Sequence, residues 1–114
     1  MAITYTYTYL GKTSKGYQLW EGLCNFLAGD LYDRDARPAF TFAGVSAVKG
    51  ILGMTGYSPG ANLGNPVAPL SISGKIVTIM VLETGAMAGV GLAEKTDDEA
   101  FGATTSIRCT IYGL

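Results

Sequence analysis

The stretch Ile3-Thr-Tyr-Thr-Tyr-Thr-Tyr-Leu10 alternates strictly between two kinds of side chain. Ile3, Tyr5, Tyr7 and Tyr9 lie on one side of an extended chain, and three threonines lie on the other. A period of two, built from aromatic and β-branched residues, predicts a β-strand. A strand so close to the N-terminus needs a pairing partner to stay ordered. We therefore expect residues 1–10 to form an edge strand of this chain's sheet, or an arm that adds to the sheet of another protein.

A second alternating stretch runs from Thr104 to Tyr112. It places Thr105, Ile107, Cys109 and Ile111 on one face, which we expect to point inward. Shorter strands are predicted around Phe40 and Phe42 and over 75–82, the latter as a buried strand. These segments predict a mainly β fold.

The segment 17–28 has a helical period and not the alternation of a strand. Leu19, Trp20, Leu23, Phe26 and Leu27 fall on one face of a 3.6-residue helix, and Gly29 follows where a C-terminal cap would lie. The sequence predicts a helix here, with Trp20 in the core, although an interior Gly22 is unfavourable in a helix. Val45, Val48, Ile51 and Leu52 predict a second, short helix on the same grounds.

Length and composition predict one small domain. The 114 residues include 48% hydrophobic and 15% charged residues, which argues against disorder. The sequence therefore predicts an α+β, mainly β single domain, a small sandwich or barrel-like sheet with one or two short helices. Its parts are the strand or arm 1–10, the helix 17–28, a Gly/Pro-rich loop 54–70, and the C-terminal β region 71–114.

The charge balance and residue types exclude several function classes. The formal charge is −1 and the chain has no histidine, so nucleic-acid binding, histidine catalysis and histidine metal sites are not expected. No segment has the length and continuity of a membrane-spanning helix, and no secretory signal is seen, which predicts a soluble protein folded in a reducing cytoplasm. We expect no catalytic residues, metal or cofactor.

Two segments resemble known chemical sites but lack residues that those sites require. Gly11-Lys12-Thr13 has the ending of a phosphate-binding loop, but Thr6 stands where the loop needs glycine. The charged segment 30–38 has acidic residues at 30, 33 and 35 but fails the spacing of a calcium loop, and Arg34 and Arg37 are expected to neutralise these carboxylates.

The two cysteines are 85 positions apart, at Cys24 and Cys109, each among apolar residues. Two reduced, buried thiols are the favoured interpretation, and a disulfide between them stays open.

Part of the C-terminal half resembles a known family. Thr84-Gly-Ala-Met-Ala-Gly-Val-Gly-Leu-Ala-Glu94, followed by Thr96-Asp97 and the strand 105–112, resembles small tailed-phage capsid decoration (cement) proteins. The resemblance implies a non-enzymatic virion protein on the capsid surface, made in the host cytoplasm. It implies binding to the major capsid protein and to copies of itself, typically as a homotrimer, with an N-terminal arm adding a strand to the capsid protein. The Trp-containing segment 17–28 departs from that pattern.

The candidate partner-binding residues are Ile3, Tyr5, Tyr7, Tyr9 and Tyr57. The first four form one face of a strand whose edge carries few charges, and Tyr57 lies in the long Gly/Pro segment. Strand addition would supply main-chain hydrogen bonds, and tyrosines would fill pockets of the partner. Two alternatives remain: a self-assembling tail, connector or coat subunit, and a small β module binding an apolar ligand.

Overall fold

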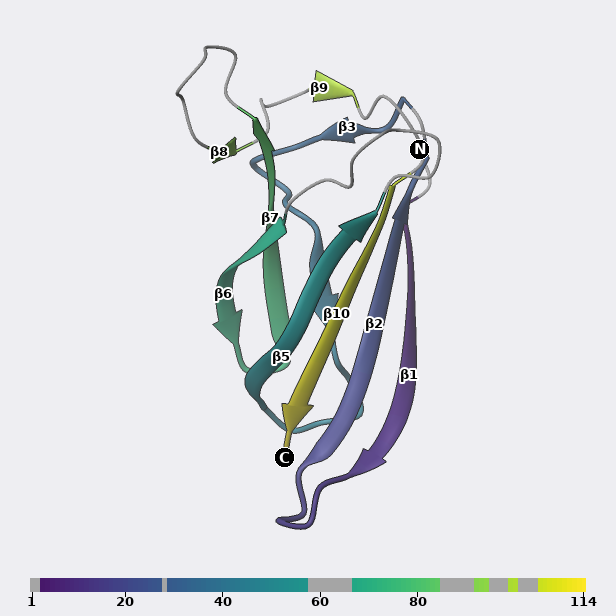
Figure 1. Ribbon diagram of the computed structural model, residues 1–114, viewed down its shortest axis with the longest axis vertical. Coiled ribbons are helices and arrows are strands. Elements are labelled where there is room, and N and C mark those ends of the chain that lie inside the picture. Colours follow the sequence, from purple (N-terminus) through teal and green to yellow (C-terminus); the bar gives the residue numbers. More distant parts are fainter. Residues whose placement is uncertain (1–2, 28, 58–66, 85–91, 95–98, 101–104) are drawn as a thin grey trace.

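The protein is described from a computed structural model, which describes residues 3–27, 29–57, 67–84, 92–94, 99–100 and 105–114. All regular elements in these residues are β-strands, ten in number (Figure 1). The mainly β prediction is confirmed, whereas the predicted helices are absent from the described chain.

The larger sheet has four antiparallel strands in the order β1-β2-β10-β5. They are β1 (Thr4–Lys12), β2 (Gln18–Phe26), β10 (Thr105–Gly113) and β5 (Val48–Tyr57). The second sheet has the order β4-β7-β6, formed by β4 (Ala39–Thr41), β7 (Ile76–Thr84) and β6 (Val67–Ser73), and β8 (Leu92–Glu94) pairs with β7. A two-residue pair, β3 (Leu31–Tyr32) with β9 (Glu99–Ala100), lies at one end of the molecule (Figure 1).

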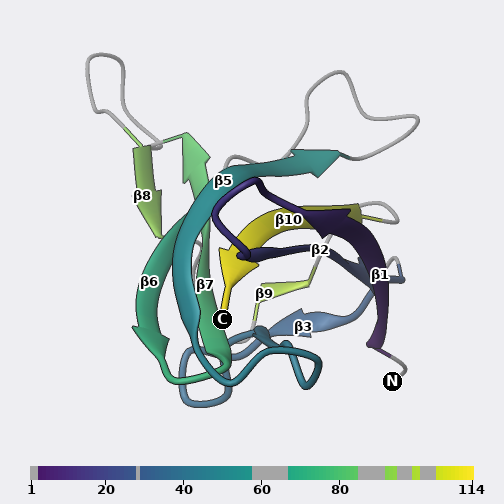
Figure 2. The ribbon, with the colours of Figure 1, turned by 90° about the horizontal axis from the view of Figure 1, so that it is seen from below.

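The two sheets face each other across one hydrophobic core (Figure 2). β10 contributes alternating residues to it, and Ile107, Cys109 and Ile111 are fully buried. This confirms the inward face predicted for 104–112. β7 contributes Val77 and Ile79 on its inner face, while its other face is only partly buried, so the strand predicted over 75–82 is buried on one side.

The segment 17–28 forms β2 instead of the predicted helix, because tertiary packing imposes a period of two on it. Trp20, Gly22, Cys24 and Phe26 face the core, and Leu19 and Leu23 lie on the outer face. Gly22 is small for a packing reason: a Cβ there would lie 2.6 Å from Cδ1 of Phe40.

The second predicted helix is also wrong, since Val48 begins β5. Two β-bulges interrupt its pairing with β10, between Val48 and Gly50 and between Ile51 and Gly53. Each bulge adds one residue to β5, so Val48, Ile51 and Met54 lie three apart while their partners on β10 lie two apart. A strand with this spacing resembles a helical pattern in sequence.

The predicted loop 54–70 is shorter than expected at both ends. β5 continues to Tyr57 and β6 begins at Val67, and residues 58–66 lie outside the described chain.

Candidate functional site: the edge strand β1 and its surroundings

The predicted binding strand is the edge strand of the larger sheet. β1 pairs along one side with β2, in a register that runs from Thr4 opposite Asn25 to Lys12 opposite Gln18, with a bulge at Leu10. Its other side has no strand partner in the described chain. The strand carries no charge until Lys12. An edge of this kind offers unpaired backbone N–H and C=O groups without the charged guards that usually block pairing.

The tyrosine face of β1 turns inward over this chain's own core. The ring of Tyr5 meets Phe40 edge-on at 5.7 Å between centroids, and Tyr7 meets Phe42 in the same way at 5.3 Å. The Tyr7 hydroxyl accepts a hydrogen bond from the Thr41 amide at 2.9 Å. The side chains of Tyr5 and Tyr7 thus pack between β1 and β4, and their contacts are intramolecular.

These aromatic residues still reach the surface. Tyr7 is 37% exposed and Tyr9 is 48% exposed, with the Tyr9 ring packed against Trp20 at 5.3 Å. Trp20 is partly buried and packs on the core from its rim, so the prediction of a core tryptophan holds only in part. Ile3 is partly buried beside the same core.

Tyr57 does not join this group. It ends β5, which is the opposite edge strand of the same sheet. It pairs with Ser106 of β10, so β2 and β10 both lie between it and β1. The structure therefore brings four of the five predicted partner residues together and places the fifth elsewhere. Nothing in the sequence pattern showed that β1 and β5 are opposite edges.

The part of the larger sheet's outer face that β1 forms is rich in threonine. Thr4, Thr6 and Thr8 lie there, and β10 and β2 carry an ion pair between Arg108 and Glu21, Nε to Oε1 at 3.5 Å. This ion pair is solvent-exposed, so its contribution to stability is small.

Both cysteines are buried and free, which confirms the favoured interpretation. Burial raises the pKa of Cys24 and of Cys109 to about 12, and burial beside Cys24 raises the pKa of Tyr5 to about 12 as well. A thiol reacts as its thiolate, so neither cysteine is an activated nucleophile at neutral pH.

The charged segment after β2 is organised around Glu94, not around its own acids. Arg37 binds the Glu94 carboxylate through two hydrogen bonds, Nε to Oε2 at 2.7 Å and Nη2 to Oε1 at 3.0 Å. The buried Tyr32 hydroxyl donates a hydrogen bond to Glu94 Oε2 at 2.7 Å. The Nε atom of Arg34 lies 3.6 Å from Glu94 Oε1. The expectation that both arginines neutralise the aspartates of this segment is wrong, because Glu94 of β8 provides their carboxylate.

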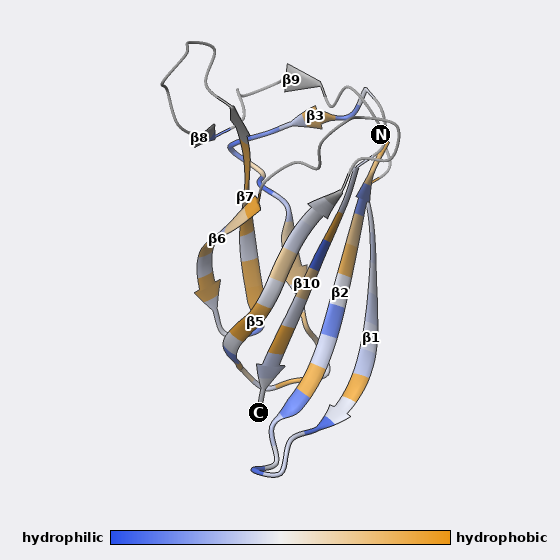
Figure 3. Cartoon of the chain, viewed as in Figure 1, coloured by the Kyte–Doolittle hydropathy of each residue, from blue (hydrophilic) through white to orange (hydrophobic). Residues whose placement is uncertain are grey.

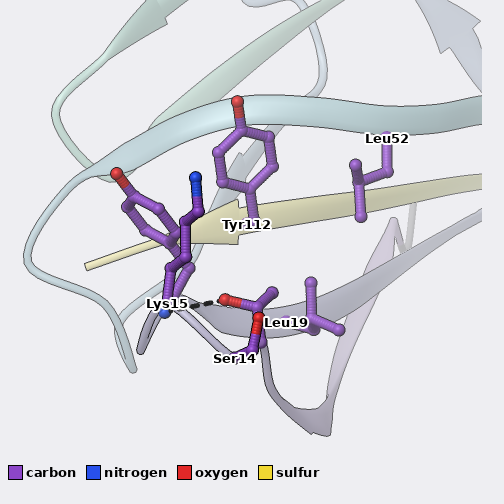
Figure 4. A pocket seen from close by; sticks show the side chains of 7 residues that line it. Ser14, Lys15, Leu19, Leu52 and Tyr112 are labelled. Atoms are coloured by element: carbon purple, nitrogen blue, oxygen red, sulfur yellow. Dashed lines mark hydrogen bonds between the residues drawn. The ribbon is translucent and has the colours of Figure 1, made fainter.

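A hollow of about 300 Å³ lies on the outer face beside the β1–β2 turn. Its walls include Leu19, Leu52 and Tyr112, and Lys15 lies at its rim with its side chain extending alongside Tyr112 (Figure 4). Tyr17 and Tyr112 meet edge-on at 5.5 Å between centroids. Sequence reasoning missed this hollow, since it joins side chains from three strands that are far apart in the chain.

Among the residues that the structure describes, no group of three or more His, Cys, Asp or Glu could hold a metal ion. The same residues contain no helix with the length and apolar character needed to cross a membrane. Neither a family model, nor a curated protein, nor a solved structure matches this chain.

Proposed function

We propose that this protein is a non-enzymatic structural protein of a virion, which binds a capsid lattice and stabilises it as a decoration protein. The observation that carries the proposal is the uncharged edge of β1 over eight residues before Lys12, which has no strand partner among the residues that the structure describes. A partner strand from a capsid subunit would extend the four-stranded sheet by one strand. The resemblance of 84–94 and 105–112 to decoration proteins supports the choice of a virion.

The position of the tyrosines refines how the partner is bound. Because Tyr5 and Tyr7 pack on Phe40 and Phe42, they hold β1 in place, and the partner is recognised mainly through the β1 backbone. The exposed parts of Tyr7 and Tyr9 lie at the rim of the added strand and would contribute apolar contact.

The test is binding of the purified protein to undecorated capsids, measured by cosedimentation and imaged by electron microscopy. The informative variant is Thr6→Lys with Thr8→Lys, which adds charge on the outer face of the edge strand and leaves the tyrosines intact. We expect regular decoration by the natural chain and at least tenfold weaker binding by the variant.

Thr110→Lys is the matched control, because it adds a lysine to the same face on the central strand β10. It should bind as the natural chain does. Random or absent attachment of the natural chain contradicts the proposal, and equal loss in Thr110→Lys contradicts the role of the β1 edge.

A further inference from the structure

Among the residues that the structure describes, the two ends of the sandwich carry charge of opposite sign. The end formed by the β1–β2 turn, the start of β5 and the β6–β7 turn (lower part of Figure 1) bears four exposed lysines: Lys12, Lys15, Lys49 and Lys75. The segments that build this end, 10–20, 43–56 and 71–76, contain no Asp or Glu. We call it the basic end. Figure 3 shows the hydrophilic β1–β2 turn at its tip.

The opposite end, with β3, β8 and β9, is the acidic end (upper part of Figure 1). Asp33 is half-buried and Asp35 is exposed, directly after β3. In the described part of the chain neither has a cationic partner, and Asp33 Oδ1 instead accepts the amide of Asp35 at 2.8 Å. The nearby Arg34 and Arg37 bind Glu94. The negative charges of Asp33 and Asp35 are therefore available to attract a cationic group of another molecule.

The apolar surfaces at the two ends are also complementary. At the basic end the hollow of about 300 Å³ has apolar walls from Leu19 and Leu52, with Lys15 at the rim. At the acidic end Leu27 is 53% exposed and Leu31 is 46% exposed, close in sequence to Asp33. The hollow with Lys15 beside it at one end, and the exposed leucines close in sequence to carboxylates at the other end, are thus complementary in chemical character.

We propose that the basic end of one copy docks on the acidic end of a second copy of this chain. Such a contact joins two different surfaces, so repetition closes a ring or extends a chain of subunits.

This head-to-tail contact deepens the proposed function, because it defines how copies of the protein contact each other, on the capsid or before they bind to it. It rests on the proposed function only in that the capsid is the place of assembly. It leaves the β1 edge free for the other partner. The two contacts can therefore fail independently.

Charge complementarity between exposed groups predicts a strong salt dependence. The screening length is about 8 Å at physiological ionic strength and about 3 Å at 1 M salt, so added salt weakens such attraction. We expect the natural chain to associate at about 0.05 M NaCl in sedimentation velocity, and to associate at least about tenfold more weakly at about 0.5 M.

Two end-blocked variants make the test specific. One carries Lys12→Glu and Lys15→Glu, which blocks the basic end, and the other carries Asp33→Lys and Asp35→Lys, which blocks the acidic end. Each alone should sediment as a monomer. Mixed in equal amounts they should associate with each other, because each supplies one intact end and the two reversed ends are also complementary in charge.

Thr110→Glu on the central strand is the charge control and should associate like the natural chain. A natural chain that stays monomeric at low salt overturns the proposal, as does a variant that self-associates like the natural chain, or a mixture that does not associate. Capsid binding by Thr6→Lys with Thr8→Lys is measured separately. Loss of capsid binding with intact self-association there leaves the head-to-tail contact standing.

Discussion

The carboxylate of Glu94 is expected to contribute stability that depends on pH. It links β8 to the segment after β3 through two hydrogen bonds from Arg37, and to β3 itself through one from the Tyr32 hydroxyl. These hydrogen bonds, from Arg37 first and Tyr32 second, lower the pKa of Glu94 from 4.5 to about 2. The perturbation is Glu94→Gln, which keeps the shape and removes the charge.

The magnitude follows from the shift in pKa. At about 1.4 kcal/mol for each pH unit, a fall from 4.5 to about 2 sets an upper limit of roughly 3 kcal/mol. The cluster lies at the surface, with 16% of the Glu94 side chain and 27% of the Arg37 side chain exposed, so water screens the charges. We expect Glu94→Gln to lower the free energy of unfolding by about 1–2 kcal/mol at pH 7.

The sign of the pH dependence is fixed by the direction of the shift. The folded-state pKa is depressed, so the stabilisation is complete above the unfolded value of 4.5 and is lost as pH falls toward about 2. Urea denaturation followed by tryptophan fluorescence at pH 7, 4.5, 3.5 and 2.5 measures it. The difference between the natural chain and the variant should shrink steadily below pH 4.5.

The matched control is Glu21→Gln, whose carboxylate has a single exposed contact to Arg108 at 3.5 Å. It should change stability by less than about 0.5 kcal/mol. A Glu94→Gln difference that is absent at pH 7, or constant from pH 7 to pH 2.5, refutes the reasoning.

Three further predictions concern packing. Gly22→Ala should destabilise by about 1–3 kcal/mol in urea titrations, because its Cβ enters occupied space, whereas Gly53→Ala, with nothing within 4 Å, should stay within about 0.5 kcal/mol. Trp20→Ala should cost about 1–3 kcal/mol, less than a fully buried tryptophan, and a loss above about 4 kcal/mol would contradict its rim position. Cys24 and Cys109 should resist a thiol reagent at pH 8 until urea unfolds the chain, and fast labelling of the native protein would show that they are not buried.

The strands with unbroken alternation were predictable from sequence. Residues 3–10 and 104–112 correspond to β1 and β10, because each presents one face to a core and one to solvent without a bulge in the middle. Ile107, Cys109 and Ile111 are buried as their spacing predicts. A regular period is kept where one face of the strand packs on the core and no bulge interrupts the middle of the strand.

β2 was missed because the protein's own packing hides its period. Its inward positions include Gly22, where an apolar side chain would have marked the alternation, and its outward positions include Leu19 and Leu23. The glycine is required by the Phe40 and Phe42 rings, which come from a segment about 20 residues later. Local reasoning has no access to a partner at that distance, so the outward leucines completed a false helical face.

The candidate site was only partly accessible for a similar reason. The sequence identified β1 as an amphipathic strand but left open whether its tyrosines bind a partner. The structure shows that Tyr5 packs on Phe40, and that no other described strand pairs with the outer edge of β1. The basic end depends even more on topology. Lys15, Lys49 and Lys75 are spread over 60 residues of sequence, and two turns and one strand start bring them to the same end.

The separation of edge and ends has a consequence for assembly. The β1 edge runs along the side of the sandwich, whereas the lysines and the acidic segment occupy its tips (Figure 1). Main-chain pairing at the side is insensitive to salt, and attraction between the tips is weakened by it. A protein with both contacts would therefore stay bound to a capsid lattice at high salt while its self-association weakens. A salt titration thus distinguishes the two interfaces without any mutation.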